Sequence, residues 1–420
     1  MAMMLPAPLR AQPSGYMFQQ PTLTGDWFGL RNRLEDRGVM LGAAEILEVL
    51  GSGGRKGGTE LDGRFELFAN IDLETALGWR GAIFHANGYQ IHGDGLSSKD
   101  LGNLMTVSNI EAQPATRLFG LWIQQSLFGD TVSLRAGQIA ADDEFFVSQY
   151  AALLINSTFG WPSIMGLNLP GGGPAYPSAR PGVRAKAAVT PALVLSAAAF
   201  SGDGKTDRDG FNFRMGGDVL LIGEAAYSTD IAALPGMFKL GAWYHSAHFA
   251  DQRINSVGLP LANPAGMSLA AMHRGNFGGY AIVDQLLWRE TGTSDRGLAG
   301  FLRIGVAPSD RNLIDFHLDG GLTYSGLVPG RESDLFGIGL SYERVGAERR
   351  GFGADAGAFT GVVLPLPDFE SALELSYQAQ IAPWWIVQPD LQIILHPGAR
   401  LTATTQDSAV VLGLRTGISF

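Results

Sequence analysis

The sequence has no cysteine and few charged residues. Charged side chains make up 17% of its 420 residues, whereas a soluble protein averages about 25%, so less material is present for a water-facing surface. The absence of cysteine suits an oxidising envelope compartment, in which a stray thiol is a hazard. The net charge of −10 argues against a nucleic-acid partner.

Long hydrophobic runs are also missing. A membrane-spanning helix needs about 18–20 apolar residues, and the nearest run, residues 192–200, is half that length and includes Ser196. Helical membrane bundles are therefore excluded, and the chain is either soluble or a β-barrel. The N-terminus lacks a charged region followed by an apolar core, so no complete secretory signal is visible, although residues 7–12 resemble the tail of a truncated one.

What the sequence does contain is alternation of apolar and polar residues, most clearly at its end. Successive side chains of a strand point to opposite faces. In residues 410–420 one face is mostly Gly, Ser and Arg415. The other face is a mostly apolar row that ends on the last residue: Val410, Leu412, Leu414, Thr416, Ile418 and Phe420. This pattern fits a strand with lipid on one side and a polar lumen on the other.

Segments with this period recur from about residue 40 to the end, and about sixteen can be counted. The expected strands are residues 39–50, 63–78, 81–92, 118–128, 131–138, 183–190, 193–200, 213–228, 237–249, 279–290, 297–306, 313–325, 334–343, 371–381, 384–395 and 408–420. The inward face is ambiguous in 39–50 and in 279–290, where Asp284 and Trp288 fall on one face.

Alternation alone does not separate a membrane barrel from a soluble β-sandwich, because both folds give each strand one apolar face. The even number of strands, the absence of a second apolar layer and the terminal Phe420 favour the barrel. Aromatic residues near strand ends, such as Trp384 and Trp385, agree with it. The sequence therefore predicts an all-β protein, a transmembrane antiparallel β-barrel of about 16 strands over residues 39–420.

Two segments do not fit the alternating pattern. After a tail of residues 1–23, residues 24–38 predict a short N-terminal helix, with Asp26 as a suitable N-cap and a glycine at its end. Residues 142–181 carry apolar side chains at helical spacing and then a Pro/Gly-rich stretch. A connection of about 40 residues is uncommon and usually has a function, so we expect it to fold inward as a constriction loop.

The order of several motifs resembles the carbohydrate-selective porin (OprB) family of Gram-negative outer membranes. The resemblance extends from about residue 24 to residue 420. Its motifs are T-G-D-W-F-G-L-R-N-R-L-E-D-R-G at 24–38, L-R-A-G-Q-I-A-A-D-D-E-F at 134–145, L-G-A-W-Y-H-S at 240–246, H-R-G-N-F-G-G-Y-A-I-V-D-Q at 273–285, R-I-G-V-A-P-S-D-R-N at 303–312, G-G-L-T-Y-S-G-L-V-P-G-R-E-S-D at 320–334, E-L-S-Y-Q-A-Q-I-A-P-W-W-I-V-Q-P-D-L-Q-I-I-L-H-P-G at 374–398 and G-L-R-T-G-I-S-F at the end.

The resemblance implies a sixteen-stranded porin in the cell outer membrane that admits sugars by passive diffusion into the periplasm, with no cofactor and no bound metal. Expected partners are mono- or oligosaccharides, outer-membrane lipid and the barrel assembly machinery, which would engage Phe420. No nucleic-acid partner is expected, and the choice between a monomer and a homo-oligomer stays open. The alternatives are a general diffusion porin and, with less support, a membrane-embedded barrel enzyme.

Sugar passage needs hydrogen-bonding groups in a narrow lumen, together with aromatic faces. Candidate pore-lining residues are the polar residues on the inward rows, each of which could instead only stabilise the wall. They are Arg64, Glu66, Asn70, Asp72, Glu74, Arg135, Arg184, Lys186, Glu224, Asp315, His317, Asp319, Glu374, Gln378, Gln380, Asp390, Gln392 and Arg415. Candidates in the constriction loop are Asp142, Asp143, Glu144, Tyr150 and Trp161, the last as a stacking platform or a loop anchor.

Catalytic interpretations find little support. The carboxylates at 142–144 are adjacent, whereas a glycosidase needs two that face each other across the sugar. No serine has the context of a nucleophile. The Gly-rich segment 51–58 lacks the ending of a phosphate-binding loop, and 203–210 lacks two ligands of a calcium loop. We therefore expect no enzymatic activity.

Overall fold

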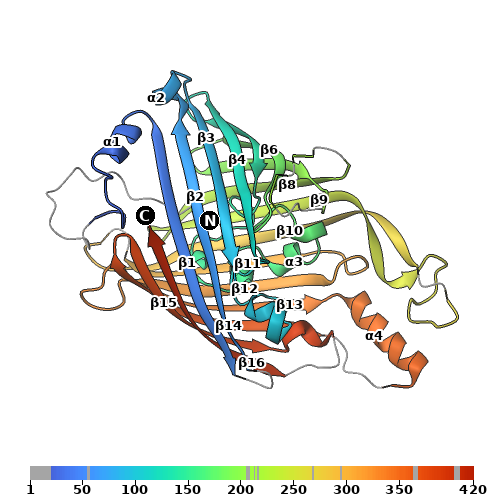
Figure 1. The fold of residues 1–420 in the computed structure, drawn as a ribbon. Helices are drawn as coiled ribbons and strands as arrows, with labels where there is room; N and C mark the ends of the chain where they lie inside the picture. The colour runs from blue at the N-terminus through green and yellow to red at the C-terminus, as the bar shows by residue number, and fades with distance from the viewer. Residues whose placement is uncertain are drawn as a thin grey trace.

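The computed structural model describes residues 20–53, 57–204, 209–211, 213–214, 217–266, 269–293, 296–362, 368–401 and 407–420. The tail up to residue 19 and parts of segments 51–58 and 203–210 lie outside the described residues. Within the described ranges, sixteen strands form one closed barrel (Figure 1). Every strand pairs antiparallel with its chain neighbours, and β1 pairs with β16, so the sheet has no open edge. The expected architecture is confirmed.

The strands are β1 Val39–Gly53, β2 Thr59–Asp72, β3 Ala82–His92, β4 Ala115–Leu127, β5 Val132–Ile139, β6 Arg180–Ala188, β7 Leu193–Ser201, β8 Val219–Ile231, β9 Leu234–Asn255, β10 Ala270–Arg289, β11 Gly297–Val306, β12 Ile314–Ser325, β13 Leu335–Val345, β14 Phe369–Ala382, β15 Trp385–Leu395 and β16 Ser408–Ser419. The helices are α1 Leu30–Glu35, α2 Leu73–Leu77, η2 Ser97–Leu101, η3 Ala151–Leu153, η4 Ser157–Phe159, α3 Ser163–Gly166, η5 Pro170–Gly172, α4 Ala347–Thr360 and η6 Pro397–Arg400. In the described part of the chain, no helix has the length and apolar character needed to cross a membrane.

Each expected strand overlaps one observed strand, in the same order. The largest differences are in β9 and β10, which have 22 and 20 residues and continue past the expected limits. These extensions reach the end of the barrel that carries the long connections (Figure 1). Two register shifts in the pairing of β9 with β10, between Ala270 and Met272 and between Arg274 and Asn276, interrupt the alternation there although the strand pairing continues.

Two predictions of secondary structure need correction. The expected helix over 24–38 is shortened to α1, and its N-cap is Gly29 rather than Asp26, because the chain takes positive φ angles at 27–29. Asp26 still accepts a hydrogen bond from the main-chain N–H of Asn32 (3.2 Å). The expected strand over 63–78 ends at Asp72, and the residues after it form α2.

Asp72 turns the chain from strand β2 into helix α2. Its carboxylate accepts the main-chain N–H of Glu74 (3.0 Å) and the hydroxyl of Thr75 (2.6 Å). We expect Asp72→Ala to lower the free energy of unfolding by about 1 kcal/mol, the usual loss for an N-cap. Urea titration of detergent-solubilised protein would measure this, and Asp72→Ser should restore most of it; an unchanged midpoint in Asp72→Ala would refute the capping role.

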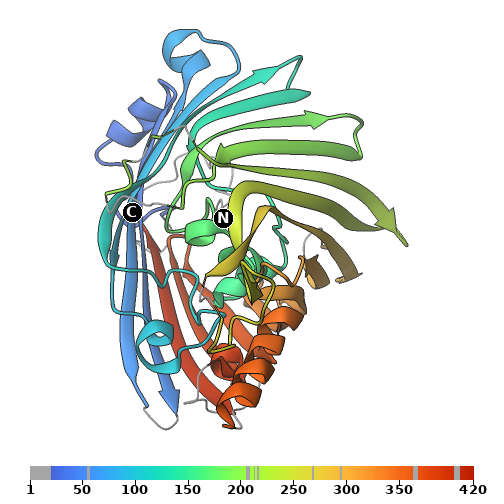
Figure 2. The ribbon, with the colours of Figure 1, turned by 90° about the vertical axis from the view of Figure 1, so that its right-hand side faces the viewer.

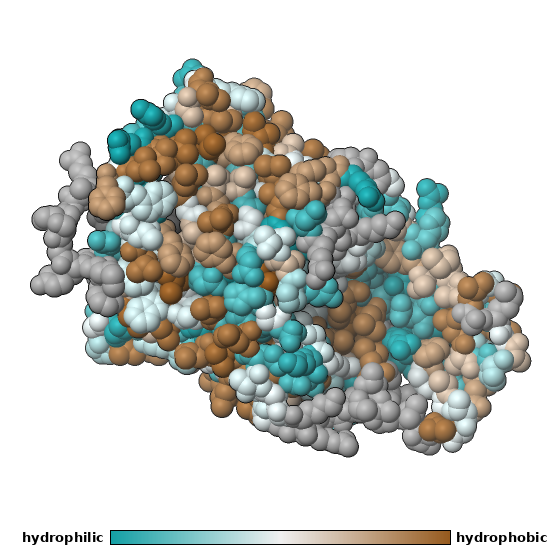
Figure 3. All heavy atoms as spheres, viewed as in Figure 1, coloured by the Kyte–Doolittle hydropathy of each residue, from teal (hydrophilic) through white to brown (hydrophobic). Residues whose placement is uncertain are grey.

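The outer face of the barrel is apolar and the inner face is polar. On β16, Leu412 and Leu414 are 64% and 51% exposed, whereas inward-facing Arg415 is 7% exposed. Figure 3 shows apolar side chains spread over the outer wall on the side that it displays. In β10, a bulge between Leu286 and Trp288 shifts the register, which places Asp284 inside and leaves Trp288 exposed.

The two ends of the barrel differ. One end carries α1, α2, the chain terminus and two-residue turns such as 383–384 (Figure 1). The other carries the long connections and α4, a helix that the sequence analysis missed. Arg253 of β9 holds α4 through Asp355 (2.8 Å). We call these the short-turn end and the long-loop end.

The N-terminal segment fastens the short-turn end. The main-chain N–H of Leu23 donates to the carbonyl of Ser419 (2.8 Å), and Arg31 donates to the carbonyl of Phe420 (2.9 Å). Phe420 also pairs with β1 through the carbonyl of Ala43 (2.9 Å). The first described residues thus cover the last strand of the barrel, beside the seam where β1 meets β16.

Candidate channel constriction

The connection between β5 and β6, residues 140–179, lies inside the barrel (Figure 2). Its apolar side chains, such as Phe146 and Ile164, join inward residues of β7 to β10 and β12 in one buried cluster, for example Ile222 and Tyr280. A buried apolar contact of this size favours a fixed position for the loop over a free one. The loop therefore covers part of the inner wall.

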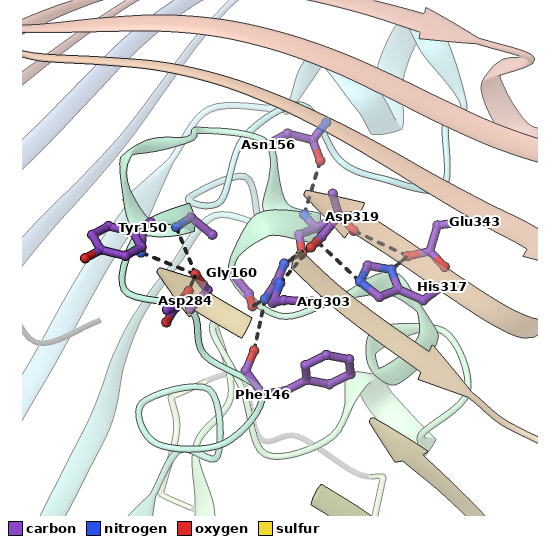
Figure 4. Close-up of polar contacts among 12 residues, drawn as sticks. Phe146, Tyr150, Asn156, Gly160, Asp284, Arg303, His317, Asp319 and Glu343 are labelled. Atoms are coloured by element: carbon purple, nitrogen blue, oxygen red, sulfur yellow. Dashed lines mark hydrogen bonds and ion pairs between the residues drawn. The ribbon is translucent and has the colours of Figure 1, made fainter. Parts of the chain in front are cut away.

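Arg303 on β11 is the main polar attachment of this loop (Figure 4). Its side chain is fully buried and pairs with Asp319 on β12 (Nε to Oδ1, 2.9 Å). The same guanidinium donates to three loop carbonyls, those of Phe146 (2.9 Å), Thr158 (2.7 Å) and Gly160 (3.1 Å). A buried arginine is tolerable only when it is paired and hydrogen-bonded, so the loop and the ion pair stabilise each other.

His317 continues this network across the next strand. Its Nε2 lies 3.2 Å from Asp319, and its Nδ1 lies 2.8 Å from Glu343 on β13; all three side chains are fully buried. The hydroxyl of Thr158 in the loop donates to the same Glu343 carboxylate (3.3 Å). These groups attach the loop to the wall and do not line an open channel.

A second attachment uses polar side chains of β14 and β15. The carboxylate of Glu374 accepts the main-chain N–H groups of Ile155 and Asn156 (2.9 Å for the latter). Gln388 on β15 donates to the carbonyl of Leu153 (2.8 Å). Carboxylates that accept main-chain N–H groups give strong, charge-assisted hydrogen bonds, so this part of the loop is also held to the wall.

A third attachment joins the loop to β8 and β10. Glu224 accepts the hydroxyl of Tyr280 (2.8 Å) and the main-chain N–H of Phe146 (3.2 Å). The rings of Phe146 and Tyr280 stack with centroids 4.1 Å apart. Further along, Asp284 accepts the hydroxyl of Ser148 and the N–H of Gln149.

The inner wall on β2 and β3 differs, because polar side chains such as Glu66, Asn70 and His85 remain partly exposed. Glu66 accepts from Asn87 (2.7 Å), and Asn70 lies 2.7 Å from the ring of His85. Between them on β2, the half-buried Phe68 also points inward. Together they form a polar surface around one aromatic ring.

Gly42 leaves room for the far end of the Phe68 ring. A Cβ at this glycine would meet three carbons of the ring at 2.3 to 2.9 Å. Any larger residue at position 42 would collide with this ring, so the glycine lets Phe68 pack against β1.

Acidic and basic groups meet where the loop leaves β5. Glu144 lies 2.9 Å from Arg135 on β5 and 2.8 Å from Arg184 on β6. Both arginines also donate to Gln124, at 3.0 and 2.8 Å. The guanidinium of Arg135 lies 4.0 Å from the centre of the Trp122 ring. Arg135 and Glu144 are 17% and 16% exposed, so they face the remaining lumen.

The other loop candidates have different surroundings. Asp142 accepts the N–H of Tyr176 (2.9 Å), and burial raises its pKa, with the neighbouring Asp143 acting in the same direction. Asp143 is exposed. The indole N–H of Trp161 donates to the carbonyl of Gly172 (2.9 Å) within the loop, which favours the loop-anchor interpretation over a stacking platform.

The structure thus divides the candidate residues. Those buried under the inward loops or in ion pairs are Arg184, Glu224, His317, Asp319, Glu374, Asp390, Gln392 and Arg415. Those with exposed or half-buried side chains on the inward rows or the loop are Arg64, Glu66, Asn70, Arg135, Asp142, Asp143, Glu144, Tyr150, Trp161, Lys186 and Gln378.

Four expected pore-lining residues lie at the ends of the barrel instead. Asp72 caps α2, and Glu74 is part of that helix, where it accepts the N–H of Gly81 (3.1 Å). Asp315 pairs with Arg344 (2.8 Å) beside the start of α4. Gln380 bonds to the turn that follows β14. The alternation of polar and apolar residues continues beyond the part of each strand that faces the channel. The sequence pattern therefore did not indicate where the channel wall ends.

Several residues of the site were missed by the sequence analysis. They are Phe68, His85, Trp122, Arg303, Glu343 and Gln388. Arg303 had a detectable signal. It is the charged residue of β11, whose other residues are apolar or glycine, and it shares the inward row with Phe301. The others depend on contacts with the loop or on cross-strand neighbours.

Comparison with known proteins agrees with this architecture. The model of the "Carbohydrate-selective porin, OprB family" matches residues 56–420. Porin B of Pseudomonas aeruginosa is 25% identical over 94% of this chain and 90% of its own length. The putative porin QuiX of Acinetobacter baylyi is 23% identical over 95% of this chain and 93% of its own length.

Among solved structures, the high-pH structure of Pseudomonas putida OprB has the same fold, with a TM-score of 0.85 and 24% identity over 97% of this chain and 100% of that one. The family model covers well over half of the sequence, and the barrel of sixteen strands agrees with it. This chain therefore belongs to the OprB family of carbohydrate-selective porins.

Proposed function

We propose that this protein is a passive channel that lets mono- or oligosaccharides diffuse across the outer membrane of a Gram-negative bacterium into the periplasm. The observation that supports this most is the division of the lumen. The inward loop is held to the wall between β8 and β15, while polar side chains around Phe68 on β2 and β3 stay partly exposed. A sugar moving along that wall would meet hydrogen-bonding groups in series, as a diffusion channel requires.

The polar surface around Phe68 suits a sugar ring in particular. Hydroxyl groups need donors and acceptors, which Glu66, Asn70 and Arg64 supply, and the apolar face of the sugar suits an aromatic ring. Acidic and basic residues are mixed near the constriction, so we expect weak ion selectivity. The short-turn end would face the periplasm, as in outer-membrane barrels.

The protein would have further partners in the membrane. Outer-membrane lipid would contact the exposed apolar rows, and the barrel assembly machinery would engage the strand that ends on Phe420 before the N-terminal segment covers it. A homo-oligomer would need an additional contact between the outer walls of two copies.

Planar-bilayer recording with purified protein tests the proposal. We expect open channels whose ion current falls when a sugar is added, because a bound sugar blocks the path of ions. Liposome swelling with sugars of increasing size should show a size limit. A current that no sugar changes would support a general diffusion porin, and the absence of current would refute the channel itself.

Phe68→Ala should weaken sugar block without closing the channel. Loss of an apolar contact of about 1 kcal/mol would raise the half-blocking sugar concentration about fivefold. The current without sugar should be unchanged or slightly larger. Phe65→Ala, on the outward row of the same strand, is the matched control and should leave the block unchanged. Equal block in the wild type and Phe68→Ala would exclude this ring as the sugar contact.

A further inference from the structure

The extended end of β9 lies beside a hollow at the long-loop end of the barrel. The hollow has a volume of about 290 Å³ and is lined by residues 167–170 of the inward loop, residues 248–250 and 252 of β9, and residues 311 and 313 after β11. Figure 3 shows the molecule hollowed at this end, beside the parts that project beyond the barrel. None of the lining residues belongs to the constriction around Arg135 and Glu144, so the hollow is a separate feature.

A bulge bends the pairing of β9 with β10 just before this hollow. The register shifts between Arg274 and Asn276, where β9 carries one residue more than β10. Gly275, between them, has a φ of 78°. Bulges bend a strand and re-aim its side chains, and they are frequent next to functional sites. The bend therefore gives a reason for the length of β9, since the residues beyond it meet residues 167–170 of the inward loop.

The walls of the hollow are fastened to one another by hydrogen bonds. The main-chain N–H of Gln252 donates to the carbonyl of Asp310 (2.8 Å), which joins β9 to the connection after β11. The side-chain amide of Asn168 donates to the carbonyl of Ile314 (2.7 Å) and accepts the N–H of the same residue (3.1 Å). The hollow is thus formed in advance, which lowers the entropic cost of binding a ligand there.

Arg311 supplies fixed hydrogen-bond donors on one side. It donates twice to the carboxylate of Asp310 (2.8 Å each) and once to the carbonyl of Gly275 (2.9 Å). An arginine has five N–H groups, and these bonds use three of them. The side chains of Arg311 and Asp310 are 15% and 36% exposed, so the pair offers both donors and acceptors to a ligand.

Two polar side chains of β9 complete the lining. Among the residues that the structure describes, neither the amide of Gln252 nor the imidazole of His248 has a hydrogen-bond partner. Between them, the half-buried ring of Phe249 meets the ring of His245 edge-on, with centroids 5.4 Å apart. The hollow thus combines unused polar groups with one aromatic ring, the combination that a sugar needs for its hydroxyls and its apolar face.

We propose that this hollow binds a monosaccharide before it enters the channel, and we call it the capture site. The inference rests on the proposed passage of sugars and adds a binding site for them. Pockets for drug-sized ligands occupy about 300–1,000 Å³, so a hollow at the lower limit suits one sugar ring rather than a chain. Arg311, Gln252 and His248 would hydrogen-bond the hydroxyls, and Phe249 would contact the ring.

The position of the capture site fits entry from outside the cell. It lies at the long-loop end, and the short-turn end is the one proposed to face the periplasm. A channel needs sites weak enough for the solute to leave each of them. With one ring and a few neutral hydrogen bonds, the capture site would hold a sugar briefly and pass it to the open side of the lumen.

Protection of an introduced cysteine by glucose tests the proposal. Ala250 is exposed and lines the hollow, so Ala250→Cys reports on the site without removing a proposed contact. We expect glucose to slow its modification by a water-soluble thiol reagent, with a saturable dependence on concentration. Ala354→Cys, exposed on α4 at the same end, is the control, and its modification rate should not change.

Two substitutions in the Ala250→Cys protein identify the contacts. Gln252→Ala and Phe249→Ala should each raise the half-protecting glucose concentration about fivefold, the usual effect of losing one hydrogen bond or one apolar contact. Gln90→Ala, an exposed glutamine of β3 opposite Phe65 on the outer row, is the matched control and should leave the protection unchanged.

Three outcomes would overturn the proposal. Glucose could fail to slow the modification of Ala250→Cys, it could slow Ala354→Cys to the same extent, or the protection could be the same after Gln252→Ala and Phe249→Ala. If glucose still blocks the ion current of the same protein, the capture site alone is refuted and the channel stands. The absence of any current would instead refute the transport function on which the inference rests.

Discussion

Arg303→Met should release the inward loop and widen the channel. The substitution roughly keeps the volume of the side chain, but it removes the arginine that pairs with the buried Asp319. It also leaves three loop carbonyls without their hydrogen-bond donor. Breaking a buried ion pair by removing one partner costs about 3–5 kcal/mol. We expect a higher single-channel conductance and passage of larger sugars, measured in planar bilayers and by liposome swelling.

Two further variants control for misfolding. Arg331→Met removes an arginine whose partner is Asp334 at the short-turn end, away from the loop, and should leave conductance unchanged. Arg303→Met combined with Asp319→Asn removes both charges of the pair and should recover part of the lost stability. Wild-type conductance in a folded Arg303→Met protein would show that other contacts are sufficient to hold the loop.

Glu144→Gln should make the channel more selective for anions. Glu144 is the carboxylate shared by Arg135 and Arg184, so its loss leaves two arginines at the constriction without their counter-charge. One unit charge at about 4 Å in water changes an ion's energy by about 1 kcal/mol, which corresponds to about fivefold in local ion concentration. The reversal potential in a KCl gradient would measure the change.

A matched variant distinguishes local charge from overall charge. Glu290→Gln removes one carboxylate at the short-turn end, where its partner is Arg296. It should shift the reversal potential much less than Glu144→Gln, because surface charges beyond a Debye length of about 10 Å are screened. Equal shifts in both variants would mean that Glu144 does not lie at the narrowest point.

The sequence was sufficient to predict the barrel, because each strand repeats the same physical requirement. An apolar outer row alternates with a polar inner row along the strand, so the faces of Leu412, Leu414 and Arg415 can be assigned without any tertiary information. The prediction was weaker where this alternation is interrupted or absent. The extensions of β9 and β10 and the helix α4 lie there.

The roles of the inward residues could not be read in the same way. Asn70 and Glu374 have the same pattern in the sequence, yet one stays half-exposed and the other is buried beneath the loop. The difference arises because residues 140–179 pack on one side of the lumen, which depends on contacts between distant segments, such as Arg303 with Thr158. Alternation identifies the inner face but not the part of it that the loop covers.

The accessibility of introduced cysteines tests the division of the lumen most directly, because the chain has no cysteine of its own. Asn70→Cys lies on the wall proposed to line the channel, and Ser376→Cys lies on β14, where the native side chain is 1% exposed. We predict that a water-soluble, sugar-sized thiol reagent modifies Asn70→Cys and lowers its conductance, while Ser376→Cys stays unmodified. Rapid modification of Ser376→Cys together with an unreactive Asn70→Cys would contradict the proposed path.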